Sequence, residues 1–178
     1  MNRLEKLEIS NVIGDFRAAL ESPDRYDHQQ LEFPKTGVDY SETDGPITYE
    51  LAMEAISVLK ENFRDSGIFG VEKDASFKSS LGQIYQTFDG KELYPTVQMK
   101  AATLLYLLVK NHSFVDGNKR IAAFIFLWYM SRNDILYRVD GSKIVSDGAL
   151  VALTLLIAES KPEEREIILK LVMNFLVM

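Results

Sequence analysis

Residues 110–124, KNHSFVDGNKRIAAF, place a cluster of polar side chains between two strongly apolar stretches of the chain. His112, one of only two histidines, closes the first stretch, and Asp116-Gly117-Asn118 opens the second. The first backbone N–H groups of a helix lack intrahelical partners and carry the positive end of the helix dipole. Gly117 lets the backbone approach a ligand closely, and Asn118 can cap the helix or donate an amide hydrogen to phosphate. The segment therefore predicts an anion site at the start of a buried helix.

Two cations and a proton acceptor adjoin this anion site. Lys119 and Arg120 fall in the first turn of the helix, where the dipole opposes each positive charge by about 0.3–1 kcal/mol; a bound phosphate reverses that sign. His112 lies close enough in sequence for a helix–loop–helix arrangement to bring its imidazole over the same pocket. Asp116 is the type of ligand that Mg²⁺ uses when it binds through one carboxylate plus substrate phosphates. Together these residues predict chemistry on a phosphate group.

Each of these residues also has an ordinary structural role. A histidine is a common end of a helix, Asp-Gly-Asn is a common turn, and a Lys-Arg pair often lies in solvent. Phe114 is best interpreted as a core residue that fixes the loop. The functional interpretation depends on the joint spacing of the polar residues between two apolar segments.

The rest of the chain predicts the elements that position this cluster. Hydrophobic periodicity predicts helices over residues 2–21, 48–67, 96–111, 119–133, 146–160 and 161–178. The helix over 119–133 is apolar on nearly every side and should run through the centre of the core. Aromatic and β-favouring residues around Asp89-Gly90 predict a short β-hairpin over residues 77–94. The predicted class is all-α with one small hairpin.

The domain boundary is expected in residues 22–46, which carry three prolines and two glycines and read as an irregular connection. Residues 1–47 then form an N-terminal helix with its connecting segment, and residues 48–178 form the main domain. Opening helices such as 2–21 usually pack on their own domain.

Composition restricts the classes of partner. The chain has 178 residues and no cysteine, which excludes thiolate metal sites. Its net charge of −6 argues against nucleic acid as the main partner. Its N-terminus lacks a signal-peptide pattern, and its longest apolar runs are about half of what a bilayer span needs. We expect a cytoplasmic protein with no membrane association; the oligomeric state stays open.

Residues 112–120, HSFVDGNKR, resemble the signature of the Fic/Doc (Fido) family, H-P-F-x-D/E-G-N-G-R. The wider stretch over residues 89–130 resembles the Doc-like branch, and the resemblance covers roughly residues 48–175. It implies a Fic-type helical bundle with a β-hairpin flap. It also implies a transferase that moves AMP from ATP onto a hydroxyl of a target protein, whereas Doc-type members of toxin–antitoxin pairs transfer phosphate. Residues 48–178 would then be the catalytic domain.

The resemblance also implies roles for individual residues. His112 would be the general base, which requires the neutral imidazole, and Asp116 would hold Mg²⁺ against the nucleotide phosphates. The nucleotide-binding residues would be Gly117, Asn118, Lys119 and Arg120, with Arg120 on the outer phosphates. The hairpin at residues 77–94 would be the flap that holds a target segment by strand addition. The structural alternative for its aromatic residues, Phe77, Tyr85 and Phe88, is core packing.

Three positions depart from the family pattern. Ser113 replaces a proline, which should loosen the loop slightly. Lys119 replaces the second glycine, so its side chain would crowd the close approach of an α-phosphate and favour phosphate transfer. Ala123 stands where many AMP-transferring members carry a second arginine. The family as a whole favours AMP transfer, so both transferred groups stay open.

The sequence also contains a candidate autoinhibitory motif and leaves two alternative functions open. Ser57, Glu61 and Asn62 match the autoinhibitory pattern S/T-x-x-x-E-G/N, whose glutamate pairs with the signature arginine, and a weaker match begins at Ser160. Without such a helix in the chain, an antitoxin-like partner could supply it. The alternative function is a non-catalytic or antitoxin-inhibited nucleotide-binding regulatory module with the Fic fold. A third interpretation is a helical scaffold without a nucleotide site.

Overall fold

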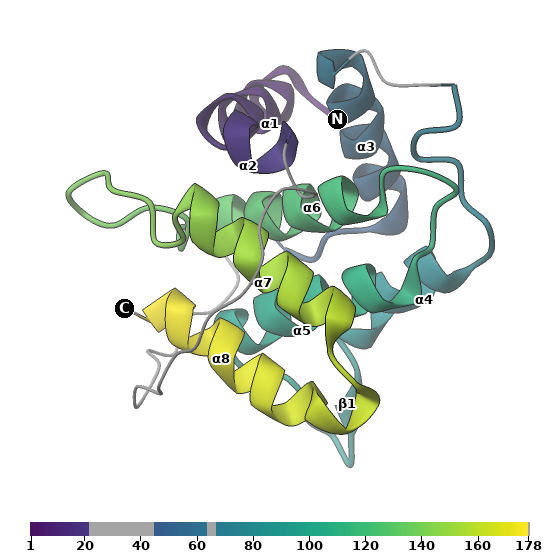
Figure 1. The fold of residues 1–178 in the computed structure, drawn as a ribbon, viewed down its shortest axis with the longest axis vertical. Coiled ribbons are helices and arrows are strands. Elements are labelled where there is room, and N and C mark those ends of the chain that lie inside the picture. Colours follow the sequence, from purple (N-terminus) through teal and green to yellow (C-terminus); the bar gives the residue numbers. More distant parts are fainter. Residues whose placement is uncertain (22–44, 64–66, 178) are drawn as a thin grey trace.

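The computed structural model describes residues 1–21, 45–63 and 67–177, and most of the predicted connection at 22–46 lies outside this range. The elements in chain order are α1 (Arg3–Asp15), α2 (Arg17–Glu21), α3 (Tyr49–Phe63), α4 (Ser76–Gln83), β1 (Thr87–Phe88), β2 (Lys91–Glu92), α5 (Val97–Asn111), α6 (Asn118–Arg132), α7 (Asp147–Glu159), a 3₁₀ turn (Pro162–Glu164) and α8 (Arg165–Val177) (Figure 1). The predicted all-α class with one small hairpin is confirmed. Each helix in these ranges is too short or too polar to span a membrane.

Helix α6 forms the centre of the core and crosses the middle of the molecule in Figure 1. Every residue from Ile121 to Met130 is buried, as the nearly continuous apolar sequence of this helix predicts. Helices α1, α2, α3, α5 and α7 all pack against it. The N-terminus of α6, which carries the polar cluster, is therefore anchored by the most buried element of the fold.

The predicted helix over residues 2–21 is two helices. An Asn2–Glu5 capping box starts α1, with hydrogen bonds of 2.9 and 2.7 Å, and the helix ends at Phe16. Phe16 and Leu20 are fully buried, so α1 and α2 share one core with α3 and α6. The helix ends at Phe16, and the chain then turns so that α2 packs against α6. The division at residues 47 and 48 stays a prediction.

The prediction of a hairpin over residues 77–94 is wrong in its first half, because residues 76–83 form α4. Phe77, Ser80, Leu81 and Ile84 are buried at helical spacing, and this signal is what the hairpin interpretation missed. The hairpin itself covers only residues 87–92. Its turn is as predicted, since Asp89 and Gly90 both have positive φ (50° and 73°), the geometry of a type I′ turn. Of the aromatic residues, Phe77 is in the core, whereas Phe88 is 76% exposed.

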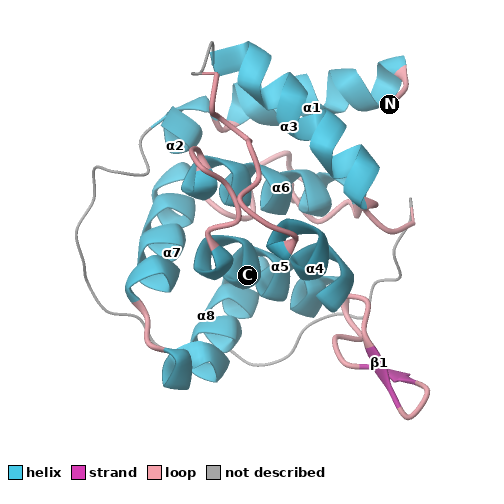
Figure 2. Ribbon diagram, turned by 90° about the vertical axis from the view of Figure 1, so that its right-hand side faces the viewer, coloured by secondary structure: helices cyan, strands magenta, loops and turns pink. Residues whose placement is uncertain are grey.

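The hairpin projects from the helical body (Figure 2), and two polar contacts fix its base. The buried ammonium of Lys100 on α5 donates to Glu92 Oε2 on β2 at 3.2 Å. Arg165 at the start of α8 donates to the Tyr94 hydroxyl at 3.1 Å. Both strands are exposed on each face. The hairpin is thus held at its root and open along its length.

Glu92→Gln should lower the free energy of unfolding by about 1 kcal/mol, because it removes the carboxylate from a buried ammonium while Glu92 itself is half-exposed. Urea denaturation measures the change. The control is Glu159→Gln, an exposed carboxylate at the end of α7 that should leave stability unchanged. Equal stability of Glu92→Gln and the control would show that the ion pair does not support the hairpin.

Candidate active site

His112 follows the last residue of α5 and has left-handed backbone geometry, with φ 46° and ψ 50°. This region is uncommon for residues other than glycine, although histidine adopts it more often than most. The conformation ends the helix and turns the chain into the loop before α6. The His112 side chain is exposed, so its imidazole is accessible to a target group at the surface.

Both sequence neighbours of His112 are hydrogen-bonded to α4. Asn111 Nδ2 donates to Ser80 Oγ at 2.8 Å, and Ser76 Oγ donates to Ser113 Oγ at 2.7 Å. Ser80 Oγ in turn donates to the Ser76 carbonyl at 2.8 Å. Ser113 is buried, so the serine that replaces the family's proline is held in place, contrary to the loosening that we expected. These bonds fix the backbone on each side of His112.

A second segment, residues 69–73, holds the loop from another side, and the sequence analysis did not identify it. Backbone hydrogen bonds join Lys73 N–H to Ser113 O (2.8 Å), Val115 N–H to Val71 O (2.8 Å) and Gly70 N–H to Asp116 O (3.2 Å). Tyr49 on α3 donates to Glu72 at 2.5 Å, and this bond raises the pKa of the Tyr49 phenol. We call residues 69–73 the strap; it ties the loop to α3.

Asn118 uses both ends of its side-chain amide to close the loop. Its Oδ1 accepts from the Phe114 backbone N–H at 2.8 Å, and its Nδ2 donates to the Phe114 carbonyl at 2.7 Å. The Phe114 ring is buried and lies 4.9 Å from the Phe77 ring, which confirms its interpretation as a core residue. With its amide committed to the loop, Asn118 can offer an anion its backbone N–H.

Asp116 is exposed, and its Oδ1 accepts from the Gly117 N–H at 2.8 Å. A single exposed carboxylate beside a phosphate site fits the way Mg²⁺ binds through one protein ligand plus substrate oxygens. Residues 1–21, 45–63 and 67–177 contain no group of three or more His, Cys, Asp or Glu side chains placed to hold a metal.

Gly117 starts α6 with φ 87° and without a side-chain cap. A Cβ built on it would lie 2.3 Å from the Phe69 ring of the strap, so glycine is required by packing as well as by its backbone geometry. The first helical N–H to find an intrahelical partner is that of Ile121, which donates to the Gly117 carbonyl at 2.8 Å. The start of α6 therefore has the backbone geometry of an anion site.

Lys119 and Arg120 are half-buried in the first turn of α6. Arg120 donates its Nε–H to the Leu20 carbonyl at 2.8 Å, and its guanidinium carbon lies 4.7 Å from the centre of the Phe63 ring. The structure thus brings Arg120 together with α2 and α3, which sequence reasoning did not predict. Both residues stay next to the loop that carries His112.

The candidate autoinhibitory residues lie on the exposed surface of α3. Ser57, Glu61 and Asn62 are all exposed, and Asn62 Nδ2 donates to the Val58 carbonyl of its own helix at 2.9 Å. Helix α3 meets Arg120 through Phe63, two residues after Glu61. In the described part of the chain, Glu61 and Arg120 form no ion pair.

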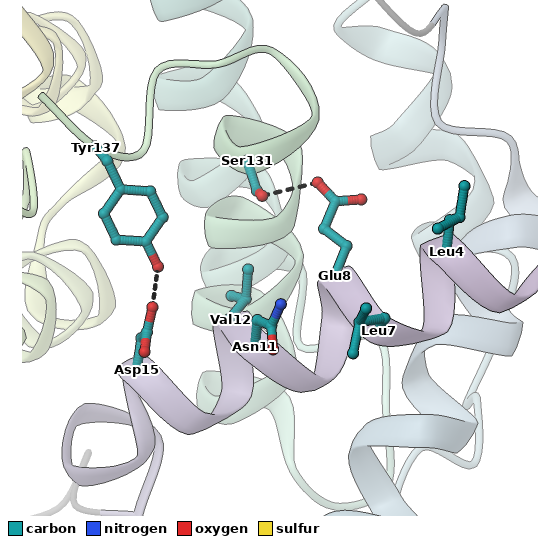
Figure 3. Close-up of a pocket in the computed structure, with 8 residues that line it drawn as sticks. All are labelled: Leu4, Leu7, Glu8, Asn11, Val12, Asp15, Ser131 and Tyr137. Carbon is teal, nitrogen blue, oxygen red and sulfur yellow. Dashed lines mark hydrogen bonds between the residues drawn. The ribbon is translucent and has the colours of Figure 1, made fainter. Parts of the chain in front are cut away.

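A hollow between α1 and the C-terminal end of α6 is a separate feature (Figure 3). Ser131 donates to Glu8 at 2.7 Å there, and the Tyr137 hydroxyl donates to Asp15. Burial is the main cause that raises the pKa of Tyr137. The length of α6, about 22 Å, separates this hollow from His112. Its carboxylates make it unsuited to a phosphate.

Comparison with known proteins agrees with the geometry of the loop. The model of the Fic/DOC family matches residues 46–130, a range that holds α3, the strap, α4, the hairpin, α5, the loop and most of α6. This confirms the family resemblance, while the Doc-like branch stays a prediction. No curated protein and no solved structure gives a significant match.

Gly117→Ala should lower the free energy of unfolding by about 2 kcal/mol or more, because alanine is strained at positive φ and its methyl group would displace the Phe69 ring. Thermal or urea denaturation measures the loss. Gly148→Ala is the matched control: nothing lies within 4 Å of that position, so the substitution should be neutral or stabilising. A Gly117→Ala protein as stable as the control would contradict the packing of Phe69 on Gly117.

Proposed function

We propose that this Fic/DOC protein transfers AMP or phosphate from ATP to a hydroxyl side chain of a target protein. The observation that carries the proposal is the loop at residues 112–118, which joins an exposed histidine at the end of α5 to the uncapped N-terminus of α6. A proton acceptor and an anion site on one fixed loop are the two groups that transfer to a hydroxyl requires. The family match supports the same class of reaction.

In the proposed reaction, neutral His112 accepts the proton of the target hydroxyl as the oxygen attacks phosphorus. For AMP transfer, the new bond joins the target oxygen to the α-phosphorus and pyrophosphate leaves; for phosphate transfer, the γ-phosphorus is attacked and ADP leaves. The backbone N–H groups of Asn118 and Lys119 at the start of α6 stabilise the charge on the transferred group, whereas the N–H of Gly117 donates to Asp116. Arg120 supplies positive charge beside the transferred group. Mg²⁺ bound through Asp116 would neutralise phosphate charge.

Two observations bear on which group moves. AMP transfer is the general activity of the family that the chain matches. Lys119, however, places a half-buried side chain in the first turn of α6, where a glycine would let an α-phosphate approach most closely. This crowding favours phosphate transfer as the second candidate, and the mass of the modified target distinguishes the two.

The hairpin is the proposed binding edge for the target. Its two-residue strands are exposed on both faces, and its base is fixed by Lys100 and Arg165. An extended target segment can add to such an edge through main-chain hydrogen bonds. The hairpin leads into the first turn of α5 and His112 follows the last residue of α5, so the bound target must also extend along this helix, about 22 Å, for its hydroxyl to reach His112. We also propose that an antitoxin-like protein could bind the site and inhibit it.

His112→Ala should lower transfer at least about 100-fold and leave Mg·ATP binding unchanged, because it removes the proton acceptor and no phosphate contact. The protein is incubated with Mg²⁺, ATP and cell lysate, and modified peptides are identified by mass spectrometry. Calorimetric titration with Mg·ATP gives the affinity in parallel. Substitution of the chain's other histidine, His28→Ala, is the control.

Each result separates the candidate functions. His112-dependent AMP or phosphate mass on a target supports the enzyme and names the group. ATP binding without any His112-dependent transfer would instead support the nucleotide-binding regulatory module. Absence of Mg·ATP binding by the wild-type protein would contradict both and leave a helical scaffold.

Glu61→Gly tests the hypothesis of autoinhibition through α3. Because Glu61 is exposed and Arg120 meets Leu20 and Phe63 instead, we expect the variant to automodify at the wild-type rate. The readout is the intact mass of the protein after incubation with Mg·ATP, with Glu61→Ala as the control for glycine in a helix. Faster automodification of both variants would show that Glu61 restrains the site.

A further inference from the structure

Arg17, the first residue of α2, and Arg120 contact the same aromatic ring. The guanidinium carbons of Arg17 and Arg120 lie 4.9 and 4.7 Å from the centre of the Phe63 ring at the end of α3. Three elements that are far apart in the sequence therefore meet at one ring beside the N-terminus of α6. Arg17 lies outside residues 46–130, so the family match assigns it no role.

Helix α2 is fixed in this position. Its Leu20 is fully buried, and the Leu20 carbonyl accepts the Nε–H of Arg120 at 2.8 Å. Ala19 and the preceding Phe16 are also buried in the core. Because Leu20 follows Arg17 by about one helical turn, the element that orients Arg120 also carries the second arginine.

A chain of contacts leads from Gly117 in the loop to Arg120 and then to Arg17. Gly117 packs against Phe69, whose ring centre lies 5.9 Å from the Arg120 guanidinium carbon. Arg120 then contacts Phe63, and Phe63 contacts Arg17. A nucleotide whose reacting phosphorus lies at Gly117 would extend its other phosphates along Arg120 toward Arg17.

The charges of this cluster suit a polyphosphate. Both guanidinium groups are always positive, and their contacts with one ring place them within about 10 Å of each other, a Debye length at moderate salt. The dipole of α6 adds positive potential at the same place. Although the protein has a net charge of −6, the two arginines and the helix dipole concentrate positive charge at the start of α6, next to the candidate base His112. Guanidinium groups bind phosphate oxygens through charge-assisted hydrogen bonds that are often bidentate.

We propose that Arg17 is a nucleotide-binding residue that contacts the phosphates distant from the reacting one. The inference rests on the proposed function, since it assigns a further residue to the same site. It makes α2 part of the nucleotide site and predicts that the site binds Mg·ATP more tightly than AMP.

Calorimetric titration of the full chain with Mg·ATP and with AMP tests the inference. Arg17→Gln should weaken Mg·ATP binding about ten-fold and change AMP binding less than two-fold, because AMP lacks the distant phosphates. Arg17→Lys keeps the charge and should bind Mg·ATP with intermediate affinity. Arg3→Gln, an equal charge change at the exposed start of α1, is the control and should bind as the wild type does.

The outcomes separate this inference from the proposed function. Wild-type protein that binds no Mg·ATP contradicts both. Wild-type binding with equal affinity in Arg17→Gln overturns the role of Arg17 alone, and tighter binding by Arg17→Gln would show that Arg17 obstructs the site. Equal losses for Mg·ATP and AMP would indicate a structural role, which thermal denaturation of Arg17→Gln and Arg17→Lys measures directly.

Discussion

Two hydrogen bonds between the Asn118 amide and the Phe114 backbone, 2.8 and 2.7 Å long, close the loop on which the candidate site depends. One planar side chain satisfies both the N–H and the carbonyl of a buried residue, which would otherwise carry the cost of unpaired polar groups. With Phe114 fixed against Phe77, the chain between α5 and α6 has little freedom. His112 and the start of α6 are held by the same closure.

The supports of this loop come from elements that do no chemistry themselves. Serine and asparagine side chains join α4 and α5 to the residues beside His112, and the strap adds backbone hydrogen bonds along the other edge. Such a network restricts a reactive side chain through its neighbours rather than by direct contact. The backbone of His112 is therefore fixed while its imidazole ring is accessible, which is what the proposed role of general base requires.

Local patterns predicted α5, α6 and the Asp89-Gly90 turn, because helical periodicity, apolar runs and turn dipeptides act over a few residues. The strap was missed since it is joined by single backbone bridges and has no period of its own. The prediction of strand over the first half of residues 77–94 is wrong, because the turn signal at Asp89-Gly90 was extended over residues that repeat at helical spacing, Phe77, Leu81 and Ile84. The break at Phe16 depends on packing over α6, which no local pattern contains.

The groups that the proposed chemistry needs can be read from nine residues, 112–120: a proton acceptor, a carboxylate, a glycine and two cations in an order that a helix–loop–helix segment can use. The surroundings of these residues depend on the tertiary fold. Arg120 meets the carbonyl of Leu20, 100 residues away, and the ring of Phe63, while Gly117 meets Phe69. Contacts of this kind depend on how α2, α3 and the strap fold back against α6. The burial of apolar side chains sets that arrangement for the whole chain at once, so no short segment encodes it.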